Sequence, residues 1–83
     1  MINPLRKAKL KWQCRRGMLE LDLILLSFLE RHVDSMSETQ IDSFDKLLHC
    51  TDPELFAWLM GHEQPEAQEF KDIVEFIKLD DSI

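Results

Sequence analysis

The amino-acid sequence predicts an all-α protein, a small five-helix bundle of the antiparallel type. Valine and threonine, which favour strands, each occur only twice among the 83 residues, whereas leucine and glutamate, which favour helices, are common. Hydrophobic residues recur at helical spacing, and no stretch shows the strict alternation that is typical of a strand. Two glycines and three prolines leave few breaks, so we expect one helical domain over residues 1–83.

The first predicted helix covers about residues 4–16 and is strongly basic. Pro4 suits the first turn, where its missing N–H costs nothing. Ala8, Leu10 and Trp12 form a narrow hydrophobic edge, and we expect Trp12 to pack into the core. Six of the ten cations lie in the first sixteen residues, which contain no acid, whereas the remainder carries sixteen acids. Such a segment either binds a polyanion or folds back onto the acidic remainder.

The second predicted helix covers about residues 18–33, and hydrophobic side chains occupy more than half of its circumference. This pattern is typical of a central helix that is packed on several sides. Asp22 lies among the hydrophobic positions, and a carboxylate there needs a partner because an unpaired buried charge is costly. The hydrophobic positions form two ridges, namely Leu21, Ile24, Leu25, Phe28 and His32, and Leu19, Leu23, Leu26 and Val33.

Three shorter helices follow. Ser37 and Gln40 match the capping box that starts a helix, and this third helix is expected to end near residue 50. Either Thr51 or Asp52 caps the fourth helix, which buries Trp58 and stops at a glycine. The fifth helix is expected to open at Gln64-Pro65 and to bury a repeat of five side chains: Phe70, Ile73, Val74, Phe76 and Ile77.

The sequence lacks the patterns of a catalytic, metal or nucleotide site. Its three histidines have no ligand spacing, and its two glycines cannot form a phosphate-binding loop. Cys14 and Cys50 are expected to be reduced thiols. The longest hydrophobic run is far shorter than the roughly 20 residues of a membrane span, and no signal peptide is visible. We therefore expect a protein of the bacterial cytoplasm with no enzyme activity, no metal and no cofactor of its own.

Residues 15–22, which read RRGMLELD, are the candidate functional site. Gly17 weakens a helix, and Arg15 and Arg16 put positive charge at the start of the next helix, where negative charge is favoured. One interpretation is a plain helix junction in which Arg16 pairs with Glu20. The other is a partner-binding surface, where Gly17 admits another backbone and both arginines donate to the partner's carboxylates or carbonyls. Glu20 would then orient Arg16 or contact the partner.

A resemblance favours the second interpretation. The RGxxE motif at residues 16–20, the continuation LDLILL, the upstream Trp12 and the stretch DPELFAWLMG at residues 52–61 resemble the FAD assembly factors of succinate dehydrogenase. The resemblance spans almost the whole chain. It implies a five-helix protein that is not an enzyme and whose partner-contacting residues include Arg16, Gly17 and Glu20. Two further candidates, Arg15 and Asp22, come from their charge and their place on the helix.

The same resemblance implies a partner and a mode of action. The factor would bind the flavoprotein subunit of succinate dehydrogenase, or of the related fumarate reductase, and promote covalent attachment of FAD to a histidine of that subunit. The FAD would belong to the partner. Two alternatives stay open at this point, an antitoxin-like partner and a nucleic-acid-binding regulator that uses Lys7, Lys9, Lys11 and Arg15. The acidic remainder of the chain disfavours nucleic acid because it repels phosphates.

Overall fold

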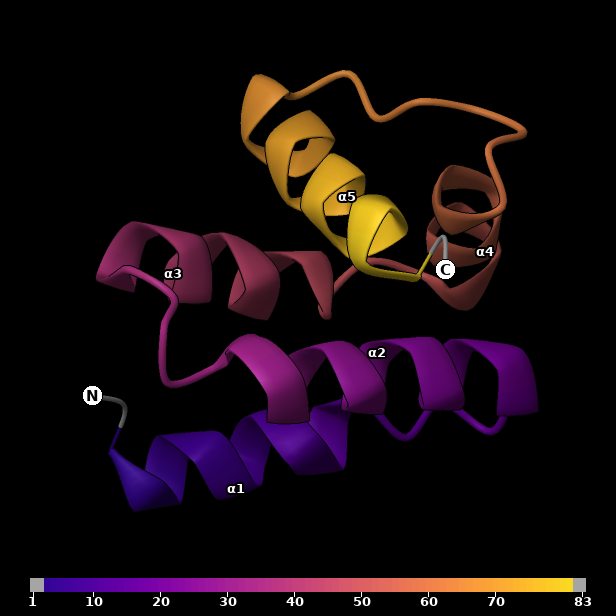
Figure 1. Cartoon of the computed structure of the whole chain (residues 1–83). Helices are drawn as coiled ribbons and strands as arrows, with labels where there is room; N and C mark the ends of the chain where they lie inside the picture. The colour runs from indigo at the N-terminus through magenta and orange to yellow at the C-terminus, as the bar shows by residue number, and fades with distance from the viewer. Residues whose placement is uncertain (1–2, 82–83) are drawn as a thin grey trace.

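The computed structural model describes residues 3–81 and confirms the all-α prediction (Figure 1). Within this range the chain forms five helices and no strand. No helix in it is both long and hydrophobic enough to cross a membrane. The helices are α1 (Pro4–Gln13), α2 (Leu19–His32), α3 (Glu38–Leu47), α4 (Asp52–Leu59) and α5 (Gln68–Asp81).

The core lies where α5 packs against α2, α3 and α4. In Figure 1, α1 lies along one side of α2, and the three later helices lie on its other side. Phe28 of α2 contacts Phe44 of α3 and Phe76 of α5, with ring centroids 5.5 and 4.9 Å apart. The α2 helix is therefore the central one, as its hydrophobic character predicted.

The predicted capping box of the third helix is present, and the fourth helix has a second one that was not predicted. Ser37 Oγ accepts a hydrogen bond from the Gln40 N–H, and the Ser37 N–H donates to Gln40 Oε1. Thr51 forms the same reciprocal pair with Glu54, so Thr51 is the N-cap of α4 and Asp52 is its first residue. Each box satisfies donors that a helix start leaves without a partner.

Helix ends differ from the prediction at three places. The third helix ends at Leu47 instead of near residue 50, because Leu48 is its C-cap. The first helix ends at Gln13, three residues early, because Cys14 is its C-cap and the chain then turns into a connection. The fifth helix begins at Gln68, after a connection that includes the buried Pro65. The early end of α1 leaves Arg15 and Arg16 outside any helix.

The prediction that Trp12 packs into the core is wrong, whereas the same prediction for Trp58 is confirmed. Trp12 is 72% exposed and Trp58 is 8% exposed. The core-facing residues of α1 are Leu10 and Cys14, and Trp12 lies two residues from each. Two residues correspond to about 200° around a helix, so the Trp12 side chain points away from the core.

One of the two ridges predicted for α2 is only partly buried. Leu19 and Leu23 are 74% and 58% exposed, whereas Val33 on the same ridge is buried. The reason is the short α1, which meets α2 near its C-terminal end through an ion pair between Lys11 and Glu30. The first turns of α2 extend past the end of α1 and remain uncovered on that side (Figure 1).

The two thiols are predicted to differ in reactivity. Cys14 is fully buried, and burial raises its pKa from the ordinary 9.0 to about 12. Cys50 is half-buried, and partial burial followed by the Glu54 charge raises its pKa less far. Iodoacetamide should therefore label Cys50 in the native chain and Cys14 only when the chain unfolds. Mass spectrometry of labelled peptides measures both rates.

A Cys50→Ser variant provides the control, because Cys14 is then the only thiol. Its labelling should accelerate with urea in proportion to the unfolded population. The buried neutral thiol also makes the free energy of unfolding fall as pH rises from about 9 towards 12, because only the unfolded thiol ionises there. Rapid labelling of Cys14 in native buffer would contradict this account.

Candidate functional site

The candidate site is the connection between α1 and α2, residues 14–18, with the first turn of α2. The Cys14 N–H still donates to the Leu10 carbonyl, and the Arg15 N–H donates to the Trp12 carbonyl. Gly17 then adopts a left-handed conformation with φ +83°, which L side chains rarely adopt. This glycine turns the chain from the end of α1 into α2.

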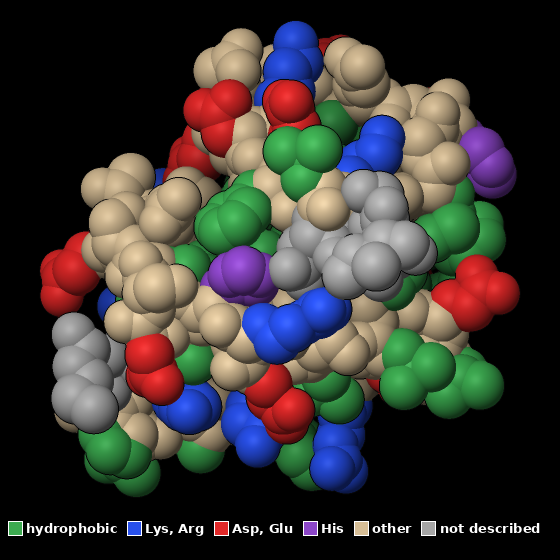
Figure 2. Space-filling view, viewed as in Figure 1, with side chains coloured by type: hydrophobic (Ala, Val, Ile, Leu, Met, Phe, Trp, Pro, Cys, Tyr) green, Lys and Arg blue, Asp and Glu red, His purple; other side chains and the backbone are tan. Residues whose placement is uncertain are grey.

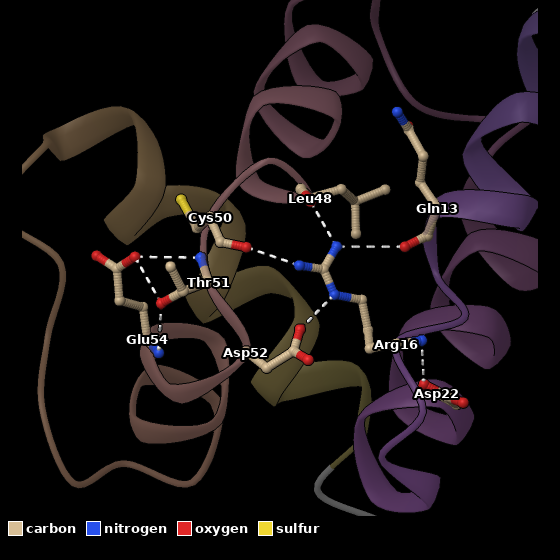
Figure 3. A network of polar contacts seen from close by, with 8 residues as sticks. All are labelled: Gln13, Arg16, Asp22, Leu48, Cys50, Thr51, Asp52 and Glu54. Atoms are coloured by element: carbon tan, nitrogen blue, oxygen red, sulfur yellow. Dashed lines mark hydrogen bonds and ion pairs between the residues drawn. The ribbon is translucent and has the colours of Figure 1, made fainter.

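The guanidinium of Arg16 is held by four acceptors of this chain (Figure 3). Its Nε donates to Asp52 Oδ1 at 2.7 Å, and Nη2 donates to the Cys50 carbonyl at 2.7 Å. Its Nη1 donates to the carbonyls of Leu48 and Gln13. The side chain is 15% exposed. One residue thus joins the end of α1, the end of α3, the connection after α3 and the start of α4.

Each of these acceptors suits a positive charge. The last carbonyls of a helix have no donor within that helix, and its C-terminus carries partial negative charge. Leu48 is the C-cap of α3, and its carbonyl receives an Arg16 donor. Asp52 is the first residue of α4, where a carboxylate is itself favoured by the helix dipole. The charge that looked misplaced before α2 is therefore well placed for α3 and α4.

Asp22 has the partner that its position required. Its Oδ1 accepts a hydrogen bond from the backbone N–H of Arg16 at 2.7 Å. The carboxylate sits in the first turn of α2 and is half-buried. It ties the connection to α2 directly before Gly17 and so fixes the backbone around the left-handed turn.

Arg15, Gly17 and Glu20 are exposed. The side chains of Arg15 and Glu20 make no hydrogen bond or ion pair with any residue between 3 and 81. The pair between Arg16 and Glu20 that a plain junction predicts is not formed, because Arg16 pairs with Asp52. A Cβ atom added at Gly17 would meet nothing within 4 Å, so within this chain its φ, not crowding, requires glycine.

The sequence matches one known family along most of its length. A family model for Sdh5, the flavinator of succinate dehydrogenase, matches residues 8–80. The chain belongs to this family.

Relatives and a solved structure agree with this assignment. The FAD assembly factor SdhE of Legionella pneumophila (strain Lens) is 54% identical over 72 residues, which cover 87% of this chain and 90% of that protein. The same-named factor of Coxiella burnetii is 45% identical over 78 residues, covering 94% and 95%. The solution structure of a UPF0350 protein superimposes with a TM-score of 0.84 at 43% identity, covering 99% of this chain and 87% of that one.

In this Sdh5-family chain, Asp52 and the carbonyls of Leu48 and Cys50 are site residues that the sequence did not reveal. Asp52 was considered only as a possible cap for α4. The two ends of its ion pair with Arg16 are 36 residues apart, and no local pattern predicts a contact over that distance. The sequence feature that points to both residues is the family resemblance. Its RGxxE motif contains Arg16, and its DPELFAWLMG stretch begins with Asp52.

Other candidate chemistry lies away from this site. No group of three His, Cys, Asp or Glu side chains in the described residues could hold a metal ion. His49 contacts Asp45, with Nε2 3.5 Å from Oδ1, and Cys50 Sγ contacts the Lys46 carbonyl. Two open grooves, of about 550 and 690 Å³, lie on α5 beside Trp58 and beside Ser43. Neither is lined by residues 14–22.

The contacts of Arg16 predict a large effect on stability. Arg16→Ala removes charge-assisted donors from three carbonyls and one carboxylate, and we expect it to lower the free energy of unfolding by about 2–4 kcal/mol. Asp52→Ala should cost less, because its carboxylate is more exposed. Urea denaturation followed by circular dichroism measures both, and the double variant gives their coupling.

Arg15→Ala is the matched control for this series. Arg15 is the neighbouring arginine, but its side chain is exposed and makes no polar contact with the described part of the chain. Its replacement should change stability by less than about 0.5 kcal/mol. Equal stability of the Arg15→Ala and Arg16→Ala variants would contradict the assignment of Arg16 as a bridge between helices.

Proposed function

We propose that this chain is an assembly factor that promotes covalent attachment of FAD to the flavoprotein subunit of succinate dehydrogenase by binding that subunit. Membership of the Sdh5 family and the similarity to the FAD assembly factors SdhE support the proposal. The flavoprotein subunit of fumarate reductase is a second target of the same kind. The chain acts without holding FAD and without being an enzyme, and the bacterial relatives are consistent with a cytoplasmic location.

One structural observation supports particular residues as the ones that contact the flavoprotein. Arg15 and Glu20 present a cation and an anion, neither paired within the described residues, on either side of the left-handed turn at Gly17. A rigid turn with free charges is suited to recognition, because little conformational entropy is lost when a partner binds. In the proposed site Arg15, Gly17 and Glu20 contact the flavoprotein, and Arg16 and Asp22 belong to the site by holding the turn in position.

The proposed mechanism is selective binding. The reaction between the partner's histidine and its flavin needs both groups to be held in reacting geometry, which orientation alone can accelerate greatly. A factor that binds the conformer in which they are aligned raises the population of that conformer. Nothing in this mechanism requires a catalytic group on the factor, and the exposed guanidinium, glycine backbone and carboxylate supply contacts for recognition.

The nucleic-acid alternative is less well supported. Three of the six cations in the first sixteen residues are paired with acids of the chain, in the pairs Arg6–Asp42, Lys11–Glu30 and Arg16–Asp52. Part of the basic segment therefore folds back onto the acidic remainder, one of the two outcomes that its charge predicted. The cations left without an acid are too few to offset the repulsion between a phosphate backbone and an acidic chain.

The general proposal is tested in cells that lack their own assembly factor. The flavoprotein subunit should show no covalent flavin fluorescence on a denaturing gel, and a plasmid with this chain should restore it. A reconstitution with purified flavin-free subunit and FAD provides the same comparison without other cell components. Normal fluorescence without the factor, or no restoration with it, would contradict the proposal.

The role of Gly17 is tested against a glycine in the same conformation. Gly61 has φ +81°, so Gly17→Asn and Gly61→Asn introduce the same backbone strain, and each should cost about 1 kcal/mol of stability. Only the Gly17→Asn variant should bind the flavoprotein more weakly and restore less flavinylation, because only there would the new side chain stand between the two proteins. Equal activity of the two variants would show that Gly17 serves the conformation of this chain alone.

A further inference from the structure

The exposed hydrophobic side chains of this protein are unevenly distributed. Five large hydrophobic residues are more than half exposed in the described part of the chain, and Leu79 on α5 is the one that lies outside residues 5–23. The other four are on α1 and the first two turns of α2, on either side of the candidate site: Leu5, Trp12, Leu19 and Leu23. A small protein rarely leaves a tryptophan and three leucines uncovered in one region without a binding role.

Helix geometry places these residues on surfaces that point away from the core. Leu5, Lys9 and Trp12 follow the spacing i, i+4, i+7 and therefore share one face of α1. Leu19 and Leu23 are four residues apart and share one face of α2. Figure 2 shows hydrophobic and basic side chains together along the lower edge of the molecule, over α1 and the N-terminal end of α2.

The same region has cations that form no ion pair within the described residues. Lys9 and Arg15 are exposed and make no ion pair with the described residues, unlike Arg6 and Lys11 of the same segment. The rest of the protein is acidic, with sixteen acids against four bases after residue 16. A surface with exposed hydrophobic residues and unpaired cations is complementary to a hydrophobic surface that is bordered by carboxylates.

We propose that Leu5, Lys9, Trp12, Arg15, Leu19 and Leu23 form one docking face for the flavoprotein subunit, with Trp12 as its main anchor. The inference rests on the proposed function and extends it from the RGxxE motif to the outer faces of two helices. The flavoprotein surface that it meets has a hydrophobic recess for the indole ring and acidic side chains opposite Lys9 and Arg15. Tryptophan is enriched among the residues that dominate interface affinity, and its stiff ring loses little freedom on binding.

The docking face adjoins the candidate site, and this favours the flavoprotein subunit as the protein that covers it. The Trp12 carbonyl accepts the Arg15 N–H, and Leu19 directly follows the N-cap residue of α2, so the face begins on both sides of the Gly17 turn. A partner that contacts Arg15, Gly17 and Glu20 is therefore adjacent to Trp12 and Leu19. A second copy of this chain, whose acidic remainder could oppose the basic face, is the competing occupant.

Binding of purified flavin-free flavoprotein subunit to the full chain tests the hydrophobic part of the face. Trp12→Ser should weaken the affinity about 30-fold or more, and Leu19→Ser with Leu23→Ser about tenfold or more. Leu79→Ser is the matched control, because it removes an exposed leucine from α5 and should leave the affinity unchanged. Thermal unfolding should be nearly unchanged in all three, since the replaced side chains lie outside the core.

Charge reversal tests the acidic border of the partner. Lys9→Glu should slow association and reduce its dependence on salt, whereas Lys78→Glu makes the same change of charge on α5 and should have little effect. Unchanged binding by Trp12→Ser would overturn the docking face while leaving the proposed function intact. No binding by the wild-type chain would contradict the proposed function itself. Sedimentation that shows a dimer dispersed by Trp12→Ser, with subunit binding retained, would assign the face to a second copy.

Discussion

The arrangement of α1, α3 and α4 depends on one guanidinium. Arg16 donates to acceptors at the ends of α1 and α3, in the connection after α3 and at the start of α4. These carbonyls have no other donor in their own helices, and the planar fork of arginine reaches several of them at once. The hydrophobic core lies where α5 packs against α2, α3 and α4. Arg16 instead sets how α1 and its connection lie relative to that core.

Because of this constraint, residues 15–22 include one group of side chains that bonds within the chain and another that is exposed. The Arg16 guanidinium and the Asp22 carboxylate bond to atoms of this chain, and Arg15 and Glu20 remain exposed without a partner in its described part. A turn held at two points has little freedom around its glycine, so the backbone positions that carry the exposed charges are fixed. A site that is fixed before binding loses less entropy on binding than a flexible one. In the proposed site, the inward residues of the motif therefore hold the turn and the outward residues contact the partner.

Local patterns predicted most of the fold but only part of the site. The capping box of α3, the buried Trp58 and the central place of α2 follow from periodicity and side-chain chemistry near in sequence. The errors were at Trp12, Leu19 and Leu23, where a helix face looked hydrophobic although nothing in the described part of the chain covers it. Periodicity shows that a face is hydrophobic, but it does not show whether the cover belongs to the same chain. The Arg16–Asp52 contact was also missed, because it depends on how separate helices pack.

The difference between local patterns and contacts between helices explains why residues 15–22 look unfavourable for helix stability in the sequence alone. A glycine and two arginines before a helix conflict with local stability, and such conflicts in a natural sequence concentrate at functional sites. The structure resolves two of these conflicts internally, because Arg16 serves the ends of other helices and the φ of Gly17 requires glycine. The fold does not explain the exposed side chains of Arg15, Trp12 and Leu19. Their charge and hydrophobic surface stabilise nothing in the described chain. Features that remain unfavourable after the fold is known are the ones that a second protein must explain.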